Sequence, residues 1–419
     1  MRLRPFLDVL RTPGVPRLLG AAVLGRMPIG MAGLAIVLLV RQTGGSYATA
    51  GLVAGSYALS LGLTAPLLGR LIDRIGQTRV LLACAGVSAG AFAALAVAAE
   101  AGSRTLLPVL AALGGASLPP VAACLRALWS ELLGRGTELQ AAFSVEAIVQ
   151  ELIFVVGPPL VALLAAVFAP AAAMLGIAVL LLAGIGVFAS APASRAWRAA
   201  PRAADWAGPL RSPGIRAVLV CIVVLAAAFG AVEVAVTAAA EQLGSRTLAG
   251  PLLALWAVGS MVGGLAFGSR GPGRPAERRL VGLLLLVAAG IAVLALVADR
   301  FQLGAGMVAA GLGIAPAIAC LYLLIDRLAP AGTVTEAFTW VNSAFGTGIA
   351  AGNATGGAIV HRAGTDAVFL LAAAAVVAAV LVARVRRPAL AEQGDRPEPA
   401  GEEGRPGMRQ DHRRLGRAG

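Results

Sequence analysis

The sequence has 419 residues, of which 58% are hydrophobic and 13% are charged. A typical soluble domain has about 45–50% apolar and about 25% charged residues, so the composition excludes an ordinary soluble globular protein. The net charge is +13, and all 34 basic residues are arginine. These arginines lie mostly in short connections between apolar segments and near the C-terminus, whereas a nucleic-acid-binding domain gathers them on a soluble surface. We therefore expect a protein that resides in the lipid bilayer and binds no nucleic acid.

Twelve apolar segments follow one another along the chain, and most are close to the ~20 residues that cross a bilayer as a helix. Backbone polar groups in hydrocarbon must hydrogen-bond internally, and these segments do not alternate as barrel strands do, so each is predicted to be a helix. The predicted fold class is an all-α integral membrane protein with twelve transmembrane helices. Their predicted bounds are 18–40, 48–69, 80–99, 105–125, 139–167, 171–190, 217–240, 248–269, 280–298, 302–325, 337–360 and 367–383.

The connections between the apolar segments predict the orientation, because arginine is enriched in short cytoplasmic connections. If the N-terminus is cytoplasmic, the outer connections contain only Arg41, Arg104, Arg246, Arg300 and Arg362, and nearly all other arginines lie in inner connections or in the tail. We therefore predict a multi-pass protein of the cytoplasmic cell membrane with both termini in the cytoplasm. The first apolar segment has no clear small-residue cleavage site and is expected to be a retained first helix.

Two polar segments predict the domain organisation. Residues 191–216 contain prolines among arginines and are predicted to be a cytoplasmic linker. This linker separates an N-terminal six-helix bundle, residues 1–190, from a C-terminal six-helix bundle, residues 217–387. Residues 388–419 are rich in glycine, proline, glutamate and arginine, a composition typical of disorder, and are predicted to be a disordered cytoplasmic tail.

The two predicted bundles repeat each other at an almost constant offset. The string LRTPGV at 10–15 recurs as LRSPGI at 210–215, and PVAACL at 120–125 recurs as PAIACL at 316–321. Gly69 corresponds to Gly268, and Thr137-Glu138 corresponds to Thr335-Glu336. Because six predicted helices separate the copies, the two halves have the same membrane orientation and are related by an axis along the membrane normal. This arrangement predicts a central pathway between two pseudo-symmetric bundles.

The connection between the second and third predicted helices, residues 69–79, reads GRLIDRIGQTR. This string resembles the glycine, aspartate and arginine loop of the major facilitator superfamily, and the resemblance extends over residues 10–385. It implies a secondary transporter of the twelve-helix, drug-efflux-like kind. On the family pattern, Gly69 permits close helix packing, Asp73 joins a charge cluster at the inner face, and Arg74 and Arg79 flank it. Arg126, at the end of the fourth helix, is the expected partner of Asp73.

Charge pairs at a wet membrane face can form in one conformation and break in another. We therefore expect the string, including Arg70 and Gly76, to act as a conformational latch that stabilises the outward-open state. The alternative is that arginines such as Arg70 and Arg79 only anchor the protein at the cytoplasmic face. The corresponding segment 268–274 in the second half has arginines but no aspartate, so a latch there must work differently.

The fifth predicted helix contains Gly157-Pro158-Pro159. Proline removes a backbone donor, so a bend is predicted at Pro158. The antiporter pattern of the superfamily has further glycines around this pair, but here those positions are Ile153, Val161 and Ala162. The pair alone is poor support for antiport.

Charged residues at membrane depth are the main candidates for the transport pathway, because each costs about 2.5–3.5 kcal/mol to insert and usually faces inward or is paired. Arg26 in the first helix lies at a depth similar to that of Glu146 and Glu151 in the fifth helix. A pair between Arg26 and one of these glutamates is expected, and the sequence leaves open which one. Gln150 shares a face with Glu146. This group either contacts substrate or carries a coupling proton, or it is only a static pair that holds the two helices together.

Three further polar or aromatic residues complete the predicted pathway. Glu233 lies deep in the seventh helix with no arginine nearby in sequence, and it either carries a proton or faces water in an outer vestibule. Asn342 and Trp340 in the eleventh helix could line the pathway, although interhelical hydrogen bonding is the commoner use of asparagine there. Glycines at small-xxx-small spacing, such as Gly51/Gly55, Gly86/Gly90 and Gly348/Gly352, are expected to pack helices closely.

These features predict a secondary active transporter that exports a small amphipathic or hydrophobic molecule by alternating access, with protons as the coupling ion. Import of a small metabolite by uniport or symport stays open. A membrane-embedded transferase is disfavoured because the sequence shows no nucleophile with a base and no acidic metal cluster. An ATP-driven pump is disfavoured because the chain has no lysine and no G-x-x-x-x-G-K-[ST] loop. We predict no enzymatic activity, no cofactor and no metal, and a monomer.

Overall fold

The structure is a computed structural model of the protein, and it describes residues 4–134, 136–201, 207–244, 248–271, 274–297 and 299–391. Within these ranges the chain forms helices, turns and bends, and no residue lies in a strand. The prediction of an all-α fold is confirmed.

The first half starts with a short helix, α1, whose buried residues are Phe6 and Val9. Six long helical segments follow, and the fourth is broken into α5 and α6 around Pro119-Pro120, where two prolines remove backbone donors. The bounds are α1 (Arg4–Arg11), α2 (Val15–Gln42), α3 (Tyr47–Ile75), α4 (Gln77–Glu100), α5 (Leu106–Ala116), α6 (Val121–Leu133), α7 (Thr137–Val167) and α8 (Pro170–Ser190).

The second half repeats this pattern. α13 and α14 form one broken helix, and α15 is two helices that meet at Gly364, which has a positive φ of 79°. We call them the first part (334–363) and the second part (365–385) of α15. The bounds are α9 (Pro192–Ala196), η1 (Gly208–Arg211), α10 (Pro213–Gln242), α11 (Ala249–Gly268), α12 (Ala276–Leu294), α13 (Arg300–Gly311), α14 (Ile314–Leu328), α15 (Val334–Val385) and α16 (Arg387–Ala391).

Ten helical segments in the described part of the chain are long and apolar enough to cross a membrane. The broken helices α5–α6 and α13–α14 each count as one of these segments, and so does the second part of α15. α12 is not among the ten, because Glu277, Arg278 and Arg279 lie in its first turns. The first part of α15 is not among them either, and it is rich in Thr, Ser, Asn and Gly. The count of twelve transmembrane helices therefore stays a prediction.

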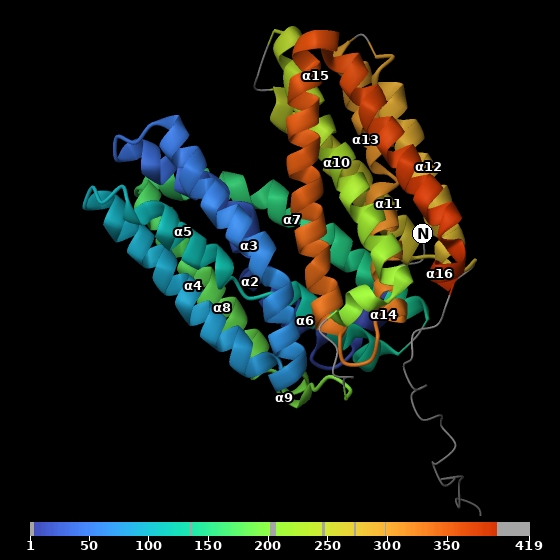
Figure 1. The fold of residues 1–419 in the computed structure, drawn as a ribbon, viewed down its shortest axis with the longest axis horizontal. Coiled ribbons are helices and arrows are strands. Elements are labelled where there is room, and N and C mark those ends of the chain that lie inside the picture. Colours follow the sequence, from blue (N-terminus) through green and yellow to red (C-terminus); the bar gives the residue numbers. More distant parts are fainter. Residues whose placement is uncertain are drawn as a thin grey trace, which may run out of the picture.

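The long helices gather into two bundles, α2 to α8 and α10 to α15, which lie side by side in Figure 1. The main contacts between the bundles join α3 to α15, and α7 to α11 and α14. The bundles approach each other at the end where α6, α9 and α14 lie, and they diverge toward the opposite end (Figure 1). We call the end that contains α9 and η1 the linker end, and the opposite end the far end.

The linker is shorter than the sequence suggests. α10 begins at Pro213 rather than near residue 217, because the Ser212 hydroxyl accepts the backbone N–H of Ile215 and caps the helix there. Residues 387–391 form α16, in which Leu390 is buried, so the expectation of disorder from residue 388 is wrong for this short stretch. The rest of the expected tail, 392–419, lies outside the described residues, and the assignment of the two domains otherwise stays a prediction.

Glycines bring α10 and the first part of α15 into close contact. A Cβ on Gly352 would clash with the backbone carbonyl of Ala227, and a Cβ on Gly230 would clash with that of Ile349. The small-residue spacing in α15 therefore serves helix packing, as predicted. The same prediction is wrong for Gly51, Gly55, Gly86 and Gly90, because a Cβ at each of these positions would meet open space.

Replacing Gly352 by alanine should force α10 and α15 apart. Overpacking of a tight contact costs about 1–3 kcal/mol, so we expect a lower Tm for Gly352→Ala in detergent. Gly51→Ala is the matched control and should leave the Tm unchanged, since no atom lies within 4 Å of its Cβ. Equal melting temperatures for the two variants would contradict the close approach of these helices.

Candidate functional site

A charge cluster lies buried between α2 and α7. Arg26 Nη1 donates to Glu146 Oε2 at 2.9 Å, and Arg26 Nη2 donates to Gln150 Oε1 at 2.7 Å. Arg26 is 1% exposed and Glu146 is 0% exposed. Glu146 and Gln150 are one helical turn apart and so face α2 together. The expected pair between the first and fifth helices is present, and its carboxylate is Glu146 rather than Glu151.

Arg126 of α6 joins the same cluster, which corrects the expectation that it pairs with Asp73. Its Nε lies 3.4 Å from Glu146 Oε2, and its guanidinium carbon lies 4.0 Å from the centre of the Tyr322 ring. Arg126 is 1% exposed, and a buried guanidinium needs the nearest buried carboxylate as a counterion. Sequence spacing could not reveal that this carboxylate comes from α7 rather than α3.

Asp73 instead contacts the start of α15. Its Oδ1 and Oδ2 accept the backbone N–H groups of Thr335 at 3.1 Å and Glu336 at 2.8 Å. The first N–H groups of a helix have no partner within the helix and carry partial positive charge, so a carboxylate is well placed there. α3 belongs to the first half and α15 to the second, so this contact joins the halves at the linker end.

Gly69 and Arg70 complete this contact. Arg70 donates to Glu336 Oε1 from Nη2 at 2.6 Å and from Nε at 3.1 Å. A Cβ on Gly69 would lie 2.8 Å from Glu336 Cα and would also clash with Thr339. Only glycine therefore lets α3 approach α15 this closely. We call Gly69, Arg70 and Asp73, together with Thr335 and Glu336, the acidic latch.

The other predicted residues of the loop lie around the acidic latch. Gly76 has φ 92° and stands between α3 and α4, where the chain turns sharply and a side chain would be strained. Gln77 is buried and donates to the carbonyl of Cys124, which fixes the loop to α6. Arg74 and Arg79 are exposed at the linker end. They are placed as surface arginines rather than as part of the buried contact.

A second contact joins the halves between α7 and α11, and its central residue, Gln140, was not predicted from the sequence. Its Nε2 donates to the carbonyls of Phe267 at 2.6 Å and Arg270 at 2.7 Å, and its Oε1 accepts from Arg279 Nη1 at 2.7 Å. A Cβ on Gly268 would approach the Phe6 ring of α1 to 2.6 Å. We call this group the amide latch.

The amide latch occupies the repeat-related position of the acidic latch. Gly268 corresponds to Gly69 in the internal repeat. Gly268 is the last residue of α11 and Gly69 lies in the last two turns of α3, and each packs against the opposite half. The carbonyls at the end of α11 need a donor, and the Gln140 amide of α7 supplies one. In the acidic latch the roles are reversed, because the Asp73 carboxylate near the end of α3 accepts from the N–H groups at the start of α15. One signal in the sequence could have indicated Gln140. It lies three residues after Thr137, and Thr137-Glu138 is the copy of Thr335-Glu336 in the internal repeat.

Glu151 lies further along α7 and contacts the second half. Its Oε1 accepts from Ser260 Oγ at 3.1 Å, and Ser260 Oγ in turn accepts the backbone N–H of Ala315 at 3.2 Å. Glu233 of α10, in the second half, interacts electrostatically with Glu151. Both side chains are half-buried. Both glutamates were predicted from the sequence as residues of the pathway, whereas Ser260 was not.

Aromatic residues lie on the second half near these carboxyls. Phe229 packs edge-on against Trp256 with ring centres 5.3 Å apart, and it lies 6.2 Å from Phe345. Trp340 and Asn342 are half-buried in the first part of α15. The Trp340 indole N–H has no hydrogen-bond partner among the described residues. Aromatic and polar groups on these helices fit the expected lining of a pathway, but that role stays a prediction.

Gly157 in the predicted bend serves helix packing. A Cβ on Gly157 would lie 2.8 Å from the carbonyl carbon of Gly30 in α2. α7 is helical from Thr137 to Val167 with Pro158 and Pro159 inside it. The glycine therefore brings α2 and α7 together beside the Arg26 cluster, and a bend at Pro158 stays a prediction.

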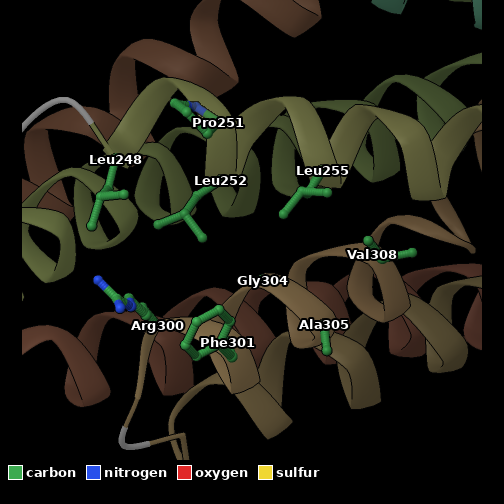
Figure 2. A pocket seen from close by; sticks show the side chains of 9 residues that line it. All are labelled: Leu248, Pro251, Leu252, Leu255, Arg300, Phe301, Gly304, Ala305 and Val308. Carbon is green, nitrogen blue, oxygen red and sulfur yellow. The ribbon is translucent and has the colours of Figure 1, made fainter.

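An apolar groove lies elsewhere, between α11 and α13, with a volume of about 370 Å³. Figure 2 shows Arg300 and Leu248 at one end and Val308 and Leu255 at the other. All lining residues belong to the second half. The groove therefore lies within the second half. Among the described residues no group of three His, Cys, Asp or Glu side chains could bind a metal ion, and the four cysteines are free.

Known structures share this fold. The human organic anion transporter MFSD10 (TETRAN) has a TM-score of 0.68 and 18% identity, with 88% of this chain and 99% of that chain covered. The fucose transporter FucP of E. coli in the outward conformation has a TM-score of 0.69 and 14% identity over 90% and 99%. A bacterial homologue of the iron transporter ferroportin in the outward-facing state has a TM-score of 0.67 and 15% identity over 89% and 99%.

The sequence comparison identifies the family. No curated protein matches the sequence. The family profile described as Major Facilitator Superfamily matches residues 18–297 and 218–414. These matches extend over most of the chain and include both bundles. The chain therefore belongs to the major facilitator superfamily of membrane transporters.

Proposed function

We propose that this protein is a proton-coupled secondary transporter that exports a small amphipathic or hydrophobic molecule across the cell membrane by alternating access. The observation that carries the proposal is that the acidic latch and the amide latch join the two halves at the linker end through hydrogen bonds and one ion pair. Such contacts can break and reform as domains rotate. Members of the superfamily are transporters rather than enzymes.

The arginine distribution supports a cytoplasmic linker end. With that orientation, the latches close the cytoplasmic side, and the diverging far ends of the bundles face outward (Figure 1). This is the arrangement of an outward-open state. Opening of both latches would expose the space between the halves to the cytoplasm. The sparse charge of the interior supports a substrate of low charge, and export follows from the resemblance to drug exporters.

Glu151 and Glu233 are the proposed proton carriers. They belong to opposite halves and repel each other when both are ionised. A proton on either carboxyl removes the repulsion, so protonation changes the free energy of bringing the halves together here. Glu146 is a poorer candidate because two arginines neutralise it. We therefore assign Glu146 to the scaffold and the other two glutamates to coupling.

The coupling proposal is tested in proteoliposomes with an imposed pH gradient. We expect the gradient to drive transport of members of a panel of amphipathic dyes in the wild type. Glu151→Gln and Glu233→Gln should abolish the response to the gradient, because an amide carries no proton. Glu100→Gln, at an exposed position at the end of α4, is the control and should transport as the wild type. Transport that ignores the gradient in the wild type would contradict proton coupling.

The latch proposal is tested with Asp73→Asn. The neutral side chain accepts the N–H groups of α15 less strongly, and hydrogen bonds to a charged group contribute about 1.5–3 kcal/mol each. Opening of the linker end should then raise the maleimide labelling rate of a cysteine at Thr339 by about ten-fold in a background without other cysteines. Thr339 is fully buried beside Gly69. The control Arg79→Gln changes an exposed arginine of the same loop, and its labelling rate should not rise.

The scaffold role of Glu146 predicts a large loss of stability in Glu146→Gln. This change leaves two buried guanidinium groups without a carboxylate, and breaking a buried pair costs about 3–5 kcal/mol. Thermal unfolding followed by tryptophan fluorescence measures the effect. Glu151→Gln is the matched control, because glutamine there can still accept from Ser260. A Tm for Glu146→Gln equal to that of the control would refute the assignment.

A further inference from the structure

The cluster of Arg26, Arg126 and Glu146 contains two guanidinium groups and one carboxylate, all fully buried. Both terminal nitrogens of Arg26 donate a hydrogen bond, Nη1 to Glu146 and Nη2 to Gln150. Arg126 has fewer partners: its Nε and Nη1 donate no hydrogen bond to any described residue, whereas Arg26 leaves only its Nε without one. A buried guanidinium with unused donors is energetically unfavourable. Arg126 is therefore the excess cation of the cluster.

Aromatic rings from the second half cover Arg126. Its guanidinium carbon lies 4.0 Å from the ring centre of Tyr322 in α14 and 6.0 Å from that of Phe338 in α15. Phe143 of α7 lies 6.0 Å from each of these two rings. Ring faces attract a guanidinium but do not neutralise it. Because Tyr322 and Phe338 belong to the second half and Arg126 to the first, separation of the halves at the linker end would uncover the guanidinium.

We propose that Arg126 binds the substrate, and that this substrate is an organic anion with a single negative charge and a flat apolar body. The guanidinium fork matches the two oxygens of a carboxylate or sulfonate. One negative charge brings the cluster to neutrality, whereas a second would be buried without a partner. The aromatic ring of Phe143 remains on the first half beside the site and provides a surface for the apolar body.

This inference rests on the proposed function, and it adds a reason why the anion leaves Arg126. The anion binds when the linker end is open, since Arg126 is then uncovered. When the linker end closes, Tyr322 returns to its place over the guanidinium and displaces the anion. The site therefore binds the anion while the linker end is open, and Tyr322 covers it in the state that the structure describes. With the linker end in the cytoplasm, this order is that of an exporter.

Asp73 is the competing carboxylate. It lies on α3 and loses its α15 partners when the acidic latch opens. If Asp73 then turned to Arg126, the cluster would be neutral without a substrate. The Asp73→Asn variant removes this competitor and also favours the open linker end, so it is the appropriate background for a binding measurement.

The experiment measures binding of three matched probes to the purified full-length protein carrying Asp73→Asn. The probes are 2-naphthalenesulfonate, the neutral 2-naphthalenesulfonamide and 2,6-naphthalenedisulfonate. We expect the monosulfonate to bind at least about ten-fold more tightly than either of the others, as follows from a charge-assisted pair. Arg126→Gln should remove this preference, and Arg126→Lys should keep part of it, since lysine retains the charge but not the fork.

Two controls separate binding from folding. Arg126→Gln leaves Arg26 and Glu146 as a balanced pair, so its Tm should not fall. In the background with native Asp73, Tyr322→Ala should raise the affinity for the monosulfonate, because the ring that displaces it is gone, whereas Tyr322→Phe should not. Equal binding of the neutral probe and the monosulfonate, or unchanged binding in Arg126→Gln, would overturn the inference.

The outcome is distinguishable from failure of the proposed function, because binding needs no pH gradient. Arg126-dependent binding of the monosulfonate without any gradient-driven transport would overturn proton coupling and leave the anion site in place. Gradient-driven transport of neutral and cationic dyes in a protein that binds neither 2-naphthalenesulfonate nor 2-naphthoate would overturn the anion site alone.

Discussion

The contact between Asp73 and the first turn of α15 is the interaction on which the observed arrangement depends. It joins a carboxylate of one half to backbone N–H groups of the other, and Gly69 makes the close approach possible. Backbone groups at a helix start have no partner of their own, so the carboxylate satisfies donors that would otherwise be buried unpaired. The contact is strong when formed, yet it contains no packed apolar core that would have to be taken apart when the halves separate.

Polar and apolar packing have different tasks in this molecule. Within each half, apolar side chains keep the helices together, and so do glycine contacts such as that of Gly352 in α15 with Ala227 in α10. Between the halves, the named contacts are an ion pair, hydrogen bonds, the close approaches at Gly69 and Gly268, and aromatic rings around Arg126. In hydrocarbon there is no hydrophobic force between helices, so close packing and hydrogen bonds determine which surfaces stay together. The boundary between the halves is therefore richer in named polar contacts than the helix packing within each half.

Much of the fold could be predicted from the sequence, because hydrocarbon permits few backbone structures and because the repeat at an offset near 200 is readable in PVAACL and PAIACL. The pairing of Arg26 with the fifth helix could be predicted from the similar depth of Arg26 and the two glutamates in the membrane. Partner choice could not be predicted: Arg126 meets Glu146 because α6 and α7 converge, and Gln140 matters because carbonyls at the end of α11 face it. The early start of α10 depends on a cap at Ser212, and the break between α5 and α6 depends on prolines within an otherwise uniform apolar segment.

The two latches differ in charge, and this difference has a consequence for how the molecule responds to ionic strength. The acidic latch includes the Arg70–Glu336 pair, in which Arg70 is 26% exposed, so dissolved ions can screen it over a Debye length of about 8 Å at 0.15 M salt. The central bonds of the amide latch run from Gln140 to two carbonyls and involve no carboxylate, so they are less sensitive to screening. Rising salt therefore weakens the acidic latch between α3 and α15 before it weakens the amide latch between α7 and α11. The two halves would then separate first at the α3–α15 contact and rotate about the α7–α11 contact.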